Sequence, residues 1–466
     1  MRQCALSITS RPVLQSSQSR SGRNSWGRGV VALKAKITAA FKGADHWRKE
    51  SHNEPPNGRA DLQCGALENE KDSGSNSGSD NEKPLSVLFA AGGTGGHVYP
   101  AIAIADAIRQ AAPNAEIHFA GTSERMEAKA VPAAGYKLHV IPAVSVRRPI
   151  WSPANTLLPF RLPAALWQCY RLVKRVAPDV VVGTGGYVSL PTCLAAALQR
   201  RAVVIQEQNA YAGLANRLLG LFATAIFLAF DAARKYFPKD KCVVGGNPTR
   251  ASLHTTHVSR AESRRWFFPQ LDEREAEEAQ VVLILGGSLG AAALNAALER
   301  GAAAGILAPS PSRRIIWQCG PRYHEKLAQT VEEQQDLLLL PFVNRMDLAY
   351  RAADLVVGRA GAITCSELLV TGTPSLLVPS PNVAQDHQTK NALAMESFGA
   401  ALLMEERQLS ADSLIENVER LLGDRQRLDT MRSRALAAVK PNAARDIALA
   451  VIKVASFAKR SGQRLV

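Results

Sequence analysis

The sequence predicts an α/β protein with two domains, each built on a parallel sheet covered by helices. The chain has 466 residues, which is too many for one ordinary domain and enough for two with an extension. Apolar strand-like runs alternate with helical patterns through most of it, as parallel α/β sheets require. Two glycine-rich runs, Gly92–His97 and Gly286–Ala291, each follow a strand-like run and precede an alanine-rich helical pattern.

These two glycine-rich runs predict phosphate-binding loops. Glycine lets backbone N–H groups approach a diphosphate closely, and the N-terminus of the following helix adds partial positive charge. Because each loop opens its own series of strands and helices, we expect twin nucleotide-binding-type domains that face one cleft. Neither loop has the GxxxxGK(S/T) spacing of P-loop NTPases, and the first misses the GxGxxG spacing of dinucleotide-binding proteins.

Composition limits the class of protein. Hydrophobic residues make up 46% of the chain, enough for full cores, and the 7 cysteines form no CxxC pair, which favours a reducing compartment. No apolar run reaches the roughly 20 residues of a membrane span, so any membrane contact would be peripheral. The net charge is +15, which suits nucleic acid, anionic lipid or a phosphorylated substrate equally well.

The N-terminal residues have a different composition from the rest. Residues 1–44 contain no Asp or Glu and carry five arginines among many serines, which is typical of an organelle transit peptide. A disordered tail that carries no targeting signal would have a similar composition. Residues 45–84 are typical of a flexible linker.

The first domain is expected over residues 85–247. Its predicted strands are Ser86–Ala91, Ile117–Ala120, Leu138–Pro142, Val180–Gly183, Val203–Gln206 and Ala225–Phe230. Its predicted helices are Pro100–Ala111, Ser123–Ala134 and Leu190–Gln199.

The second domain is expected over residues 248–466, after a charged stretch at 260–280 that is either helical or loose. Its predicted strands are Val281–Leu285, Arg314–Gln318, Leu337–Phe342, Leu355–Val357, Ser375–Pro379 and Ala400–Met404. Two later helical segments, Ala411–Leu422 and Ala443–Lys459, could pack back across the cleft.

His97 closes the first glycine run. At a helix N-terminus the pKa of a histidine falls, which favours the neutral form and suits a general base. Contact with the acceptor substrate and a purely structural cap are the alternatives.

Polar residues follow two further strands of the first domain. Gly183–Tyr187 lies at a carboxyl end, where open α/β sheets bind ligands, although a tight turn is the alternative. Gln206–Asn209 places four polar side chains after an apolar run, which is costly unless they are paired. Within this run Glu207 or Asn209 could hold a sugar or phosphate, and Asn216 lies about two helical turns beyond.

Two polar runs of the second domain suit a nucleotide sugar. Within Arg359–Glu367, Thr364 and Ser366 can serve as caps or diphosphate donors. Glu367 can accept from two ribose hydroxyls, or it is an ordinary first-turn acid. Asp386–Asn391 offers amides for sugar hydroxyls, or it is a solvated helix start.

Residues 144–175 suggest a membrane-facing surface. Apolar Ile150, Trp151, Leu157, Leu158, Phe160, Leu162 and Trp167 alternate with basic Arg147, Arg148, Arg161, Arg171, Lys174 and Arg175. A basic rim around apolar groups favours an anionic bilayer. Ordinary packing of an amphipathic segment against the sheet would give a similar pattern.

The motifs GGTGGH, GGYVS, EQN, GNP.R, GGS.GA and RAGA.T.SE occur in this order over roughly residues 85–457. As a set they resemble the UDP-N-acetylglucosamine transferases that convert lipid I to lipid II in peptidoglycan synthesis. That resemblance implies a GT-B fold of two Rossmann-like domains about a cleft. It also implies inverting, metal-independent transfer from UDP-GlcNAc to a polyprenyl-diphosphate-linked muramoyl-peptide, with no nucleic-acid partner. No DxD-like pair stands beside a glycine loop, so we expect no resident cofactor, and stimulation by a loosely bound divalent cation stays open.

The resemblance also implies roles for individual residues. On the donor side Ser288 would contact the diphosphate, Val343 would contact the uracil and Glu367 would contact the ribose. Arg250 would contact the donor from the hinge, and Gln388 and Asn391 would contact the sugar. The nucleotide would lie against Ala362, Ile363, Thr364, Cys365, Ser366 and Glu367. The acceptor side would contain Thr94, Gly95, Gly96, Tyr187, Asn209 and Asn216, with His97 and Glu207 as the catalytic residues.

Two features depart from the family pattern. Gln206 stands where family members usually have histidine, which would lower activity if that histidine assists the acceptor diphosphate. The N-terminal extension suggests a plastid enzyme, bound peripherally to the inner envelope or thylakoid membrane. Alternatives are a plastid UDP-galactose:diacylglycerol galactosyltransferase, a non-catalytic nucleotide-sugar or lipid-binding protein and, more distantly, a nicotinamide oxidoreductase.

Overall fold

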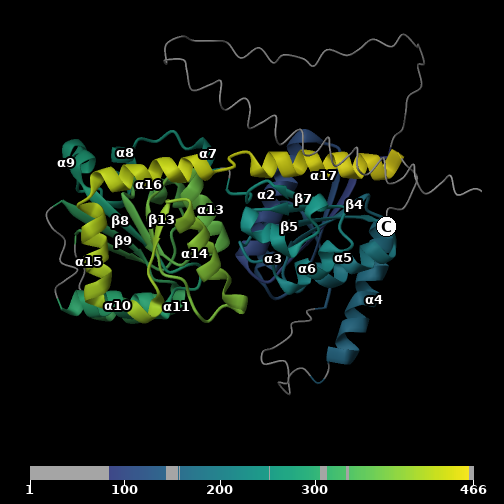
Figure 1. Cartoon of the computed structure of the whole chain (residues 1–466), viewed down its shortest axis with the longest axis horizontal. Helices are drawn as coiled ribbons and strands as arrows, with labels where there is room; N and C mark the ends of the chain where they lie inside the picture. The colour runs from purple at the N-terminus through teal and green to yellow at the C-terminus, as the bar shows by residue number, and fades with distance from the viewer. Residues whose placement is uncertain are drawn as a thin grey trace, which may run out of the picture. The chain divides into compact units, whose positions relative to one another are not determined.

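The computed structural model of the chain describes residues 83–142, 156, 158–250, 252–304, 312–331 and 335–460 (Figure 1). The chain divides into two units, residues 1–63 and 64–466, and everything below belongs to the second. The predicted transit peptide, nearly all of the predicted linker and residues 143–155 and 157 of the membrane-facing stretch lie outside the described residues.

The first domain contains a seven-stranded parallel sheet with the strand order β3-β2-β1-β4-β5-β6-β7. Its strands are β1 (Ser86–Ala91), β2 (Glu116–Gly121), β3 (Lys137–Val140), β4 (Val180–Gly185), β5 (Ala202–Glu207), β6 (Ala225–Leu228) and β7 (Cys242–Val244). Its helices are α2 (Gly95–Ala111), α3 (Met126–Ala133), α4 (Leu158–Val176), α5 (Ser189–Leu198) and α6 (Leu214–Gly220).

The second domain repeats this arrangement in a six-stranded parallel sheet, ordered β10-β9-β8-β11-β12-β13. Its strands are β8 (Gln280–Leu285), β9 (Arg313–Gln318), β10 (Leu337–Leu340), β11 (Leu355–Gly358), β12 (Ser375–Leu377) and β13 (Ala401–Leu403). Its helices are α7 (Ser252–Thr255), α8 (Arg260–Phe267), α9 (Glu273–Glu278), α10 (Ala292–Ala303), α11 (Pro321–Thr330), α12 (Met346–Ala352), α13 (Ala362–Thr371), α14 (His387–Ser397), α15 (Ala411–Leu422) and α16 (Arg425–Ala438).

The strand order of each sheet reverses at one point, between β1 and β4 in the first domain and between β8 and β11 in the second. Ligands of open α/β sheets bind at the carboxyl ends of the strands beside such a point. Four of the predicted polar or glycine-rich loops follow these four strands. The two-sheet α/β fold class predicted from the sequence is therefore confirmed.

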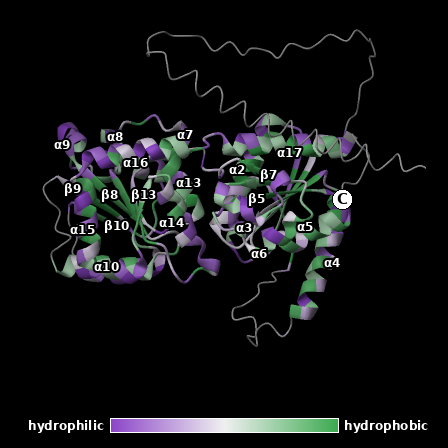
Figure 2. Cartoon of the chain, viewed as in Figure 1, coloured by the Kyte–Doolittle hydropathy of each residue, from purple (hydrophilic) through white to green (hydrophobic). Residues whose placement is uncertain are grey.

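Burial explains why the strands form. The strands are mainly hydrophobic in Figure 2, and most of their residues are buried because helices cover parallel sheets on both faces. Phe89 and Phe119 stack with ring centroids 5.0 Å apart in the first core. In the second core the fully buried Trp317 donates its indole N–H to Asn295 Oδ1 at 3.1 Å.

The sequence missed β7 and misplaced two helix starts, because α3 begins at Met126 and not at Ser123. The three residues of β7 form an edge strand after the charged run Lys239–Lys241, too short to give a periodic signal. Helix α2 was predicted to begin at Pro100, but it begins at Gly95. The second half of the glycine run is thus helical, which brings His97 into the first turn.

The C-terminal helix returns to the first domain. Helix α17 (Ala443–Arg460) packs against α2 and near β4 and β5, and Figure 1 shows it in yellow beside α2. Helix α15, the other segment expected to be able to cross, instead packs against α10 and α16 of the second domain. The first domain is therefore covered partly by the last helix of the chain.

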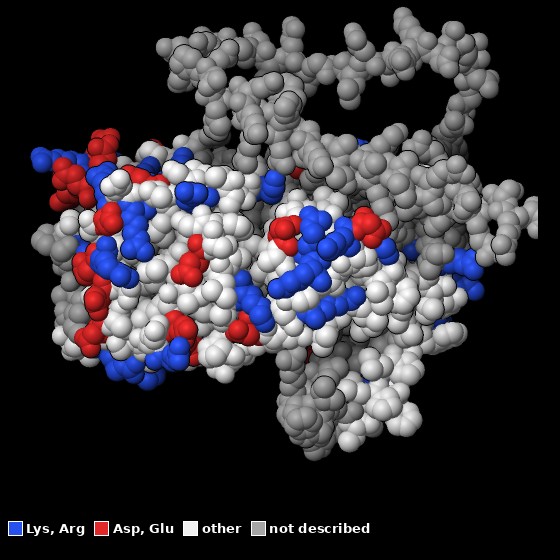
Figure 3. All heavy atoms as spheres, viewed as in Figure 1, with Lys and Arg blue, Asp and Glu red and all other residues white. Residues whose placement is uncertain are grey.

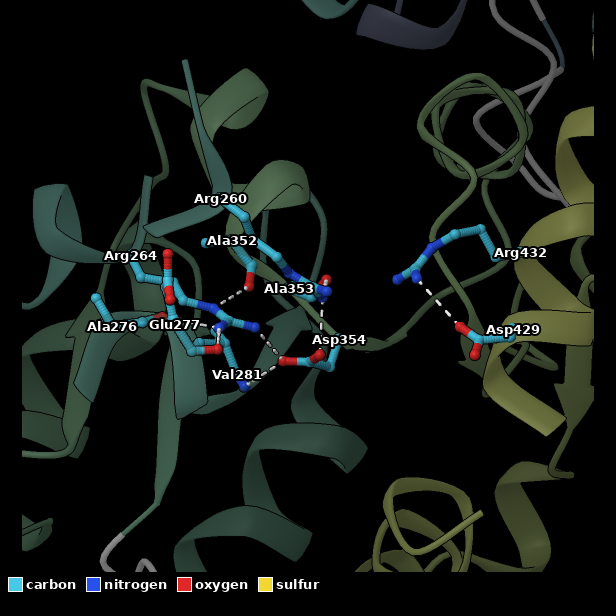
Figure 4. Close-up of polar contacts among 10 residues, drawn as sticks. All are labelled: Arg260, Arg264, Ala276, Glu277, Val281, Ala352, Ala353, Asp354, Asp429 and Arg432. Carbon is cyan, nitrogen blue, oxygen red and sulfur yellow. Dashed lines mark hydrogen bonds and ion pairs between the residues drawn. The ribbon is translucent and has the colours of Figure 1, made fainter. Parts of the chain in front are cut away.

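Helix α8 is fastened to the second sheet by a buried ion-pair network (Figure 4). The guanidinium of Arg264, which is buried, lies 2.8 Å from Asp354 Oδ2 and also donates to the carbonyl groups of Ala352 and Ala276. Asp354 additionally pairs with Arg260 at 2.8 Å and accepts from the backbone N–H of Val281. One carboxylate thus joins α8 to the beginnings of β8 and β11.

We expect Asp354→Ala to destabilise the protein by about 3 kcal/mol, because the change leaves the Arg264 guanidinium buried and unpaired. The measurement is urea unfolding of the full chain, followed by circular dichroism, with a lower midpoint expected. Arg274→Ala is the matched control, since it removes an ion pair with Glu278 in which both side chains are exposed. Equal midpoints for the two variants would contradict the assignment.

Candidate functional site

The first glycine loop joins β1 to α2. Thr94 is exposed at the N-cap, and its carbonyl accepts from the N–H groups of His97 and Val98 at 3.1 and 3.2 Å. Helix geometry directs the earlier N–H groups, at Gly95 and Gly96, out of the helix end, where a phosphate can accept from them. The loop is held by the fully buried Glu127, which accepts from Gly93 N at 2.9 Å and Thr122 Oγ1 at 2.6 Å.

The His97 ring has a defined proton arrangement. Its Nδ1 lies 3.1 Å from the carbonyl oxygen of Thr184 and 3.3 Å from Oε1 of Gln208. Both oxygens can only accept, so Nδ1 carries the proton. In the neutral ring Nε2 therefore keeps its lone pair and can take a proton from a substrate.

The environment of His97 favours this neutral form. Loss of hydration on burial lowers the pKa of His97 below its usual value near 6.5. The charge of Glu207 and the hydrogen bonds to Gln208 and Thr184 oppose the shift, whereas His387 of the second domain adds to it. The ring is uncharged at neutral pH as a result.

The loop after β4 packs directly against the first glycine loop. Gly185 and Gly186 have φ values of +104° and +79°, and a Cβ at Gly186 would come within 2.2 Å of the Gly92 carbonyl oxygen. A Cβ at Gly185 would lie 2.7 Å from His97 Nδ1, so glycine is required for the ring to fit. Tyr187 lies in the same loop, with its hydroxyl 3.4 Å from Thr122 Oγ1.

Glu207 is a buried carboxylate with both oxygens fully used. Oε1 accepts from the backbone N–H and side-chain amide of Asn209 at 3.1 and 3.2 Å. Oε2 accepts from Gly213 N at 3.1 Å and from Asn216 Nδ2 at 2.8 Å. Four donors fill the four lone-pair positions of a carboxylate that is 1% exposed. This geometry suits the positioning of Asn209 and Asn216, and it does not suit proton transfer with a substrate.

A chain of amides runs from His97 into the second domain. Gln208 donates from Nε2 to the Thr184 carbonyl at 2.5 Å and to Oε1 of Gln206. Gln206 donates in turn to Asn247 Oδ1 at 2.7 Å. Asn247 then donates to Ser366 Oγ at 2.8 Å, in the first turns of α13. This amide chain, which we define as Gln208, Gln206 and Asn247, connects His97, expected on the acceptor side, with Ser366, expected on the donor side.

Asn391 forms a second link between the domains. Its Oδ1 accepts from the backbone N–H of Ala210 at 2.8 Å. Its Nδ2 donates to Asn209 Oδ1 at 3.2 Å and to the Ala360 carbonyl at 3.1 Å. The structure thus brings a residue expected on the sugar donor into contact with one expected on the acceptor.

The second glycine loop follows β8 and leaves Ser288 exposed at its tip. Gln318 connects this loop to the predicted uracil site. Its Nε2 donates to the Gly287 carbonyl at 2.8 Å, and its Oε1 accepts from the backbone N–H of Val343 at 3.4 Å. Ser288 and Val343 therefore border one region of the second domain.

Helix α13 begins at the carboxyl end of β11 and presents its first turn, Ala362–Thr364, as a partly exposed surface. The Cys365 side chain is fully buried in the core, so that position can offer only backbone to a ligand. Ser366 Oγ donates to the Ala362 carbonyl at 2.9 Å, which fixes it as the acceptor for Asn247.

Glu367 is buried and held from two sides. Arg250 Nε donates to Oε1 at 2.8 Å, and the buried Tyr350 hydroxyl donates to Oε2 at 3.0 Å. Burial raises the pKa of Glu367, while Arg250 and the hydrogen bond from Tyr350 oppose that change. A cavity of about 460 Å³ is bordered by Arg250, Ile363 and Glu367 and by Tyr99 of α2.

The remaining predicted donor residue, Gln388, lies at the start of α14, where its Oε1 accepts from Ser380 N at 2.9 Å. Sequence reasoning missed Glu127, Gln318 and Tyr350, which carry no glycine-motif signal. Across the described ranges, no group of three or more His, Cys, Asp or Glu side chains is arranged to hold a metal ion.

Comparison with known proteins agrees with this geometry. Residues 87–228 match the glycosyltransferase family 28 N-terminal domain, and residues 281–448 match its C-terminal domain. The UDP-N-acetylglucosamine–N-acetylmuramyl-(pentapeptide) pyrophosphoryl-undecaprenol N-acetylglucosamine transferase of Salinibacter ruber is 48% identical over 373 residues, covering 79% of this chain and 96% of the relative. The Bacteroides thetaiotaomicron transferase of the same name is 38% identical, covering 80% and 99%.

Solved structures give the same family. The crystal structure of MurG from Acinetobacter baumannii superposes with a TM-score of 0.62 at 30% identity, covering 80% of this chain and all of that one. A Neisseria meningitidis UDP-GlcNAc 2-epimerase, at 16% identity and a TM-score of 0.56, shares the fold. The motifs, the paired sheets with their loops at the switch points and the matches over both domains show that this chain belongs to glycosyltransferase family 28, among the MurG-type N-acetylglucosaminyltransferases.

Proposed function

We propose that this protein transfers N-acetylglucosamine from UDP-GlcNAc to lipid I, a muramoyl-pentapeptide carried on a polyprenyl diphosphate, and so forms lipid II. The observation that carries the proposal is 48% identity to a transferase of this name over 96% of its length, together with the site that the two domains share. The enzyme is therefore a hexosyltransferase of peptidoglycan synthesis, and the galactosyltransferase and non-catalytic alternatives are disfavoured.

We propose the following chemistry for the reaction. The 4-hydroxyl of the acceptor sugar loses its proton to His97 Nε2 as its oxygen attacks the anomeric carbon of GlcNAc. The bond from that carbon to the UDP oxygen breaks, with inversion at the carbon. The N–H groups of the second glycine loop and of the first turn of α13 stabilise the negative charge that develops on UDP, and need no metal ion to do so.

The residues around the reacting atoms have positioning roles. Glu207 orders Asn209 and Asn216 on the acceptor side, and Glu127 orders the first glycine loop. On the donor side Glu367 offers its remaining lone pairs to the ribose while Arg250 and Tyr350 hold its carboxylate. Thr94, Gly95, Gly96 and Tyr187 border the acceptor diphosphate, and Ser288, Val343, Gln388 and Asn391 border the donor.

Incubation of the purified chain with labelled UDP-GlcNAc and a lipid I analogue should give a labelled disaccharide lipid. We expect His97→Ala to lower kcat by about 10²–10⁴-fold while leaving UDP-GlcNAc affinity unchanged, because the base acts only in the transition state. Binding is measured separately by isothermal titration. A wild-type chain that forms no product, or makes it equally well from UDP-galactose, would refute the function.

The pH dependence tests the base assignment separately. The lowered pKa of His97 means that its proton is lost below pH 6.5, so kcat/KM should rise with pH, level off by about pH 7, and have its acidic limb below 6.5. This acidic limb of the kcat/KM profile should be absent in His97→Ala. Wild-type activity in that variant would remove the base role while leaving the transferase function intact.

We also propose that α4 contacts an anionic membrane surface. The buried side of α4 packs against α5, whereas Phe160, Leu162 and Trp167 are 75%, 40% and 63% exposed. The helix contains no acidic residue, and Arg171, Lys174 and Arg175 are exposed near its end. Figure 2 shows the outer end of α4 as largely hydrophobic, and on the face in Figure 3 it is mostly uncharged. Apolar groups beside basic ones suit a lipid interface.

No helix in the described part of the chain is both long and apolar enough to cross a membrane. If α4 contacts the membrane as proposed, we expect Phe160→Ser/Trp167→Ser to weaken binding to phosphatidylglycerol vesicles at least about tenfold, because each exposed ring would otherwise gain burial in the interface. Vesicle sedimentation measures the binding. Trp266→Ser, at a residue 59% exposed on α8, is the matched control, and equal loss in both would contradict the role of α4.

We further propose that residues 1–44 direct the protein to a plastid, on the support of their arginine- and serine-rich, acid-free composition. Residues 1–84 fused to a fluorescent protein should accumulate in chloroplasts of a transformed algal or plant cell. A fusion of residues 45–84 is the control and should stay in the cytosol. Cytosolic fluorescence from both fusions would refute the proposed plastid targeting.

A further inference from the structure

A second cavity of the second domain lies outside the site described above. It has a volume of about 500 Å³, within the range of about 300–1,000 Å³ that small-molecule sites occupy. Helices α7, α8, α12, α13 and α16 supply its walls through Leu253, Arg260, Arg351, Thr371 and Arg432, among other residues. None of these five side chains belongs to the glycine-rich and polar motifs that identify the transferase family.

The charge of the lining is strongly unbalanced. Three arginines, Arg260, Arg351 and Arg432, line the cavity against one carboxylate, Asp347. That carboxylate is already committed, because Arg345 outside the lining donates to both its oxygens at 3.0 and 2.8 Å. Arg260 pairs with Asp354, which lies outside the lining, so the excess of positive charge in the cavity comes from Arg351 and Arg432.

Two of these arginines, Arg351 and Arg432, make few hydrogen bonds among the described residues. Arg351 donates from Nε to the Val258 carbonyl at 3.0 Å, and among the described residues its terminal nitrogens make no hydrogen bond. Within the same described ranges, the only ion pair of Arg432 is a 3.5 Å contact with Asp429, whose side chain is 63% exposed. Figure 4 shows the Arg432 guanidinium extending toward the side of the cavity where Arg260 and Ala353 lie.

The pKa of Arg260 also reflects the positive charges that surround this side chain. Burial lowers its pKa to about 10; Asp354 opposes the shift, and the charges of Arg264, Arg432 and Arg425 add to it. Like charges held together in a concave site repel one another, and an anion bound among them would relieve that repulsion.

We propose that this cavity binds a phosphate monoester or diphosphate of a small organic molecule. Guanidinium groups from three helices can each form paired N–H···O bonds with phosphate oxygens, which is the geometry that arginine favours. Ser259 lies in the same lining, and its hydroxyl accepts from the backbone N–H of Glu262, whereas the Thr256 hydroxyl already donates to Asp347 Oδ2 at 2.9 Å. Apolar Leu253, Val370 and Leu436 border the space that remains, and so suit the organic part of the ligand better than a free inorganic ion.

The cavity shares a wall with the donor site. Tyr350 lines it, and the hydroxyl of the same residue donates to Glu367 at 3.0 Å. Thr371 also lines it and donates to the Glu367 carbonyl at 2.9 Å. A bound phosphate would therefore lie one side chain away from the carboxylate assigned to the ribose, yet in a separate site.

Isothermal titration of the full chain with inorganic pyrophosphate, with and without saturating UDP, tests this proposal. We expect one pyrophosphate site that persists when UDP is present. In Arg351→Gln/Arg432→Gln its affinity should fall at least about tenfold, while transfer of GlcNAc stays at the wild-type rate. Arg265→Gln/Arg274→Gln, which removes two exposed arginines away from the cavity, should bind as the wild type does.

Three results would overturn the proposal. They are the absence of any pyrophosphate binding, its complete displacement by UDP, and equal binding by the two double variants. None depends on the transfer reaction, so a failure of the proposed function would leave this test interpretable. A double variant that loses transfer activity along with its folded circular dichroism signal is replaced by the single change Arg351→Gln, at an exposed residue.

Discussion

The buried amide chain of Gln208, Gln206 and Asn247 is the constraint on which the site depends. It joins the ring of His97 to the first turns of α13, and each of its three side chains is 5% exposed or less. Amides can be buried at low cost when every donor meets an acceptor, whereas ions would pay a large desolvation penalty there. Because every amide both donates and accepts, the chain has one self-consistent orientation. That orientation places Oε1 of Gln208 against Nδ1 of His97 and so leaves Nε2 for the acceptor.

The amide chain gives the Gln206 side chain a role that differs from the one considered from the sequence. The sequence indicates that Gln206 in place of the usual family histidine would lower activity if that histidine assists the acceptor diphosphate. In the structure Gln206 is fully buried and bonds to Gln208 and Asn247, so its side chain serves the link between the domains. A glutamine does not titrate near neutral pH, and therefore the link keeps its hydrogen bonds while His97 changes its protonation state.

The sequence predicted the parts of this protein that depend on local pattern. Every strand except β7, the glycine loops at the switch points and the family were predicted from the sequence, and the 48% identity to a known transferase confirms the family. Partners separated by long stretches of chain were not predicted. Glu127 meets Gly93 across 34 residues, and Tyr350 reaches Glu367 from another helix, so neither pairing leaves a periodic trace. The return of α17 to the first domain was left open for the same reason, because an amphipathic helix does not specify which sheet it covers.

The hydrogen bonds already made by the donor-side residues restrict what each can offer the substrate. Glu367 accepts one bond at each oxygen and keeps a second lone pair at each, so two ribose hydroxyls can bind without displacing Arg250 or Tyr350. Asn391 has both amide hydrogens committed, to Asn209 and to the Ala360 carbonyl. Asn391 is fully buried, so it can present its remaining Oδ1 lone pair or an amide hydrogen to a sugar only if a neighbouring contact changes. A donor sugar that takes a hydrogen bond from Asn391 must displace either the Ala360 carbonyl or Asn209. Displacement of Asn209 would loosen the contact between the domains on the side proposed for the acceptor, and would couple the two substrates through a single amide.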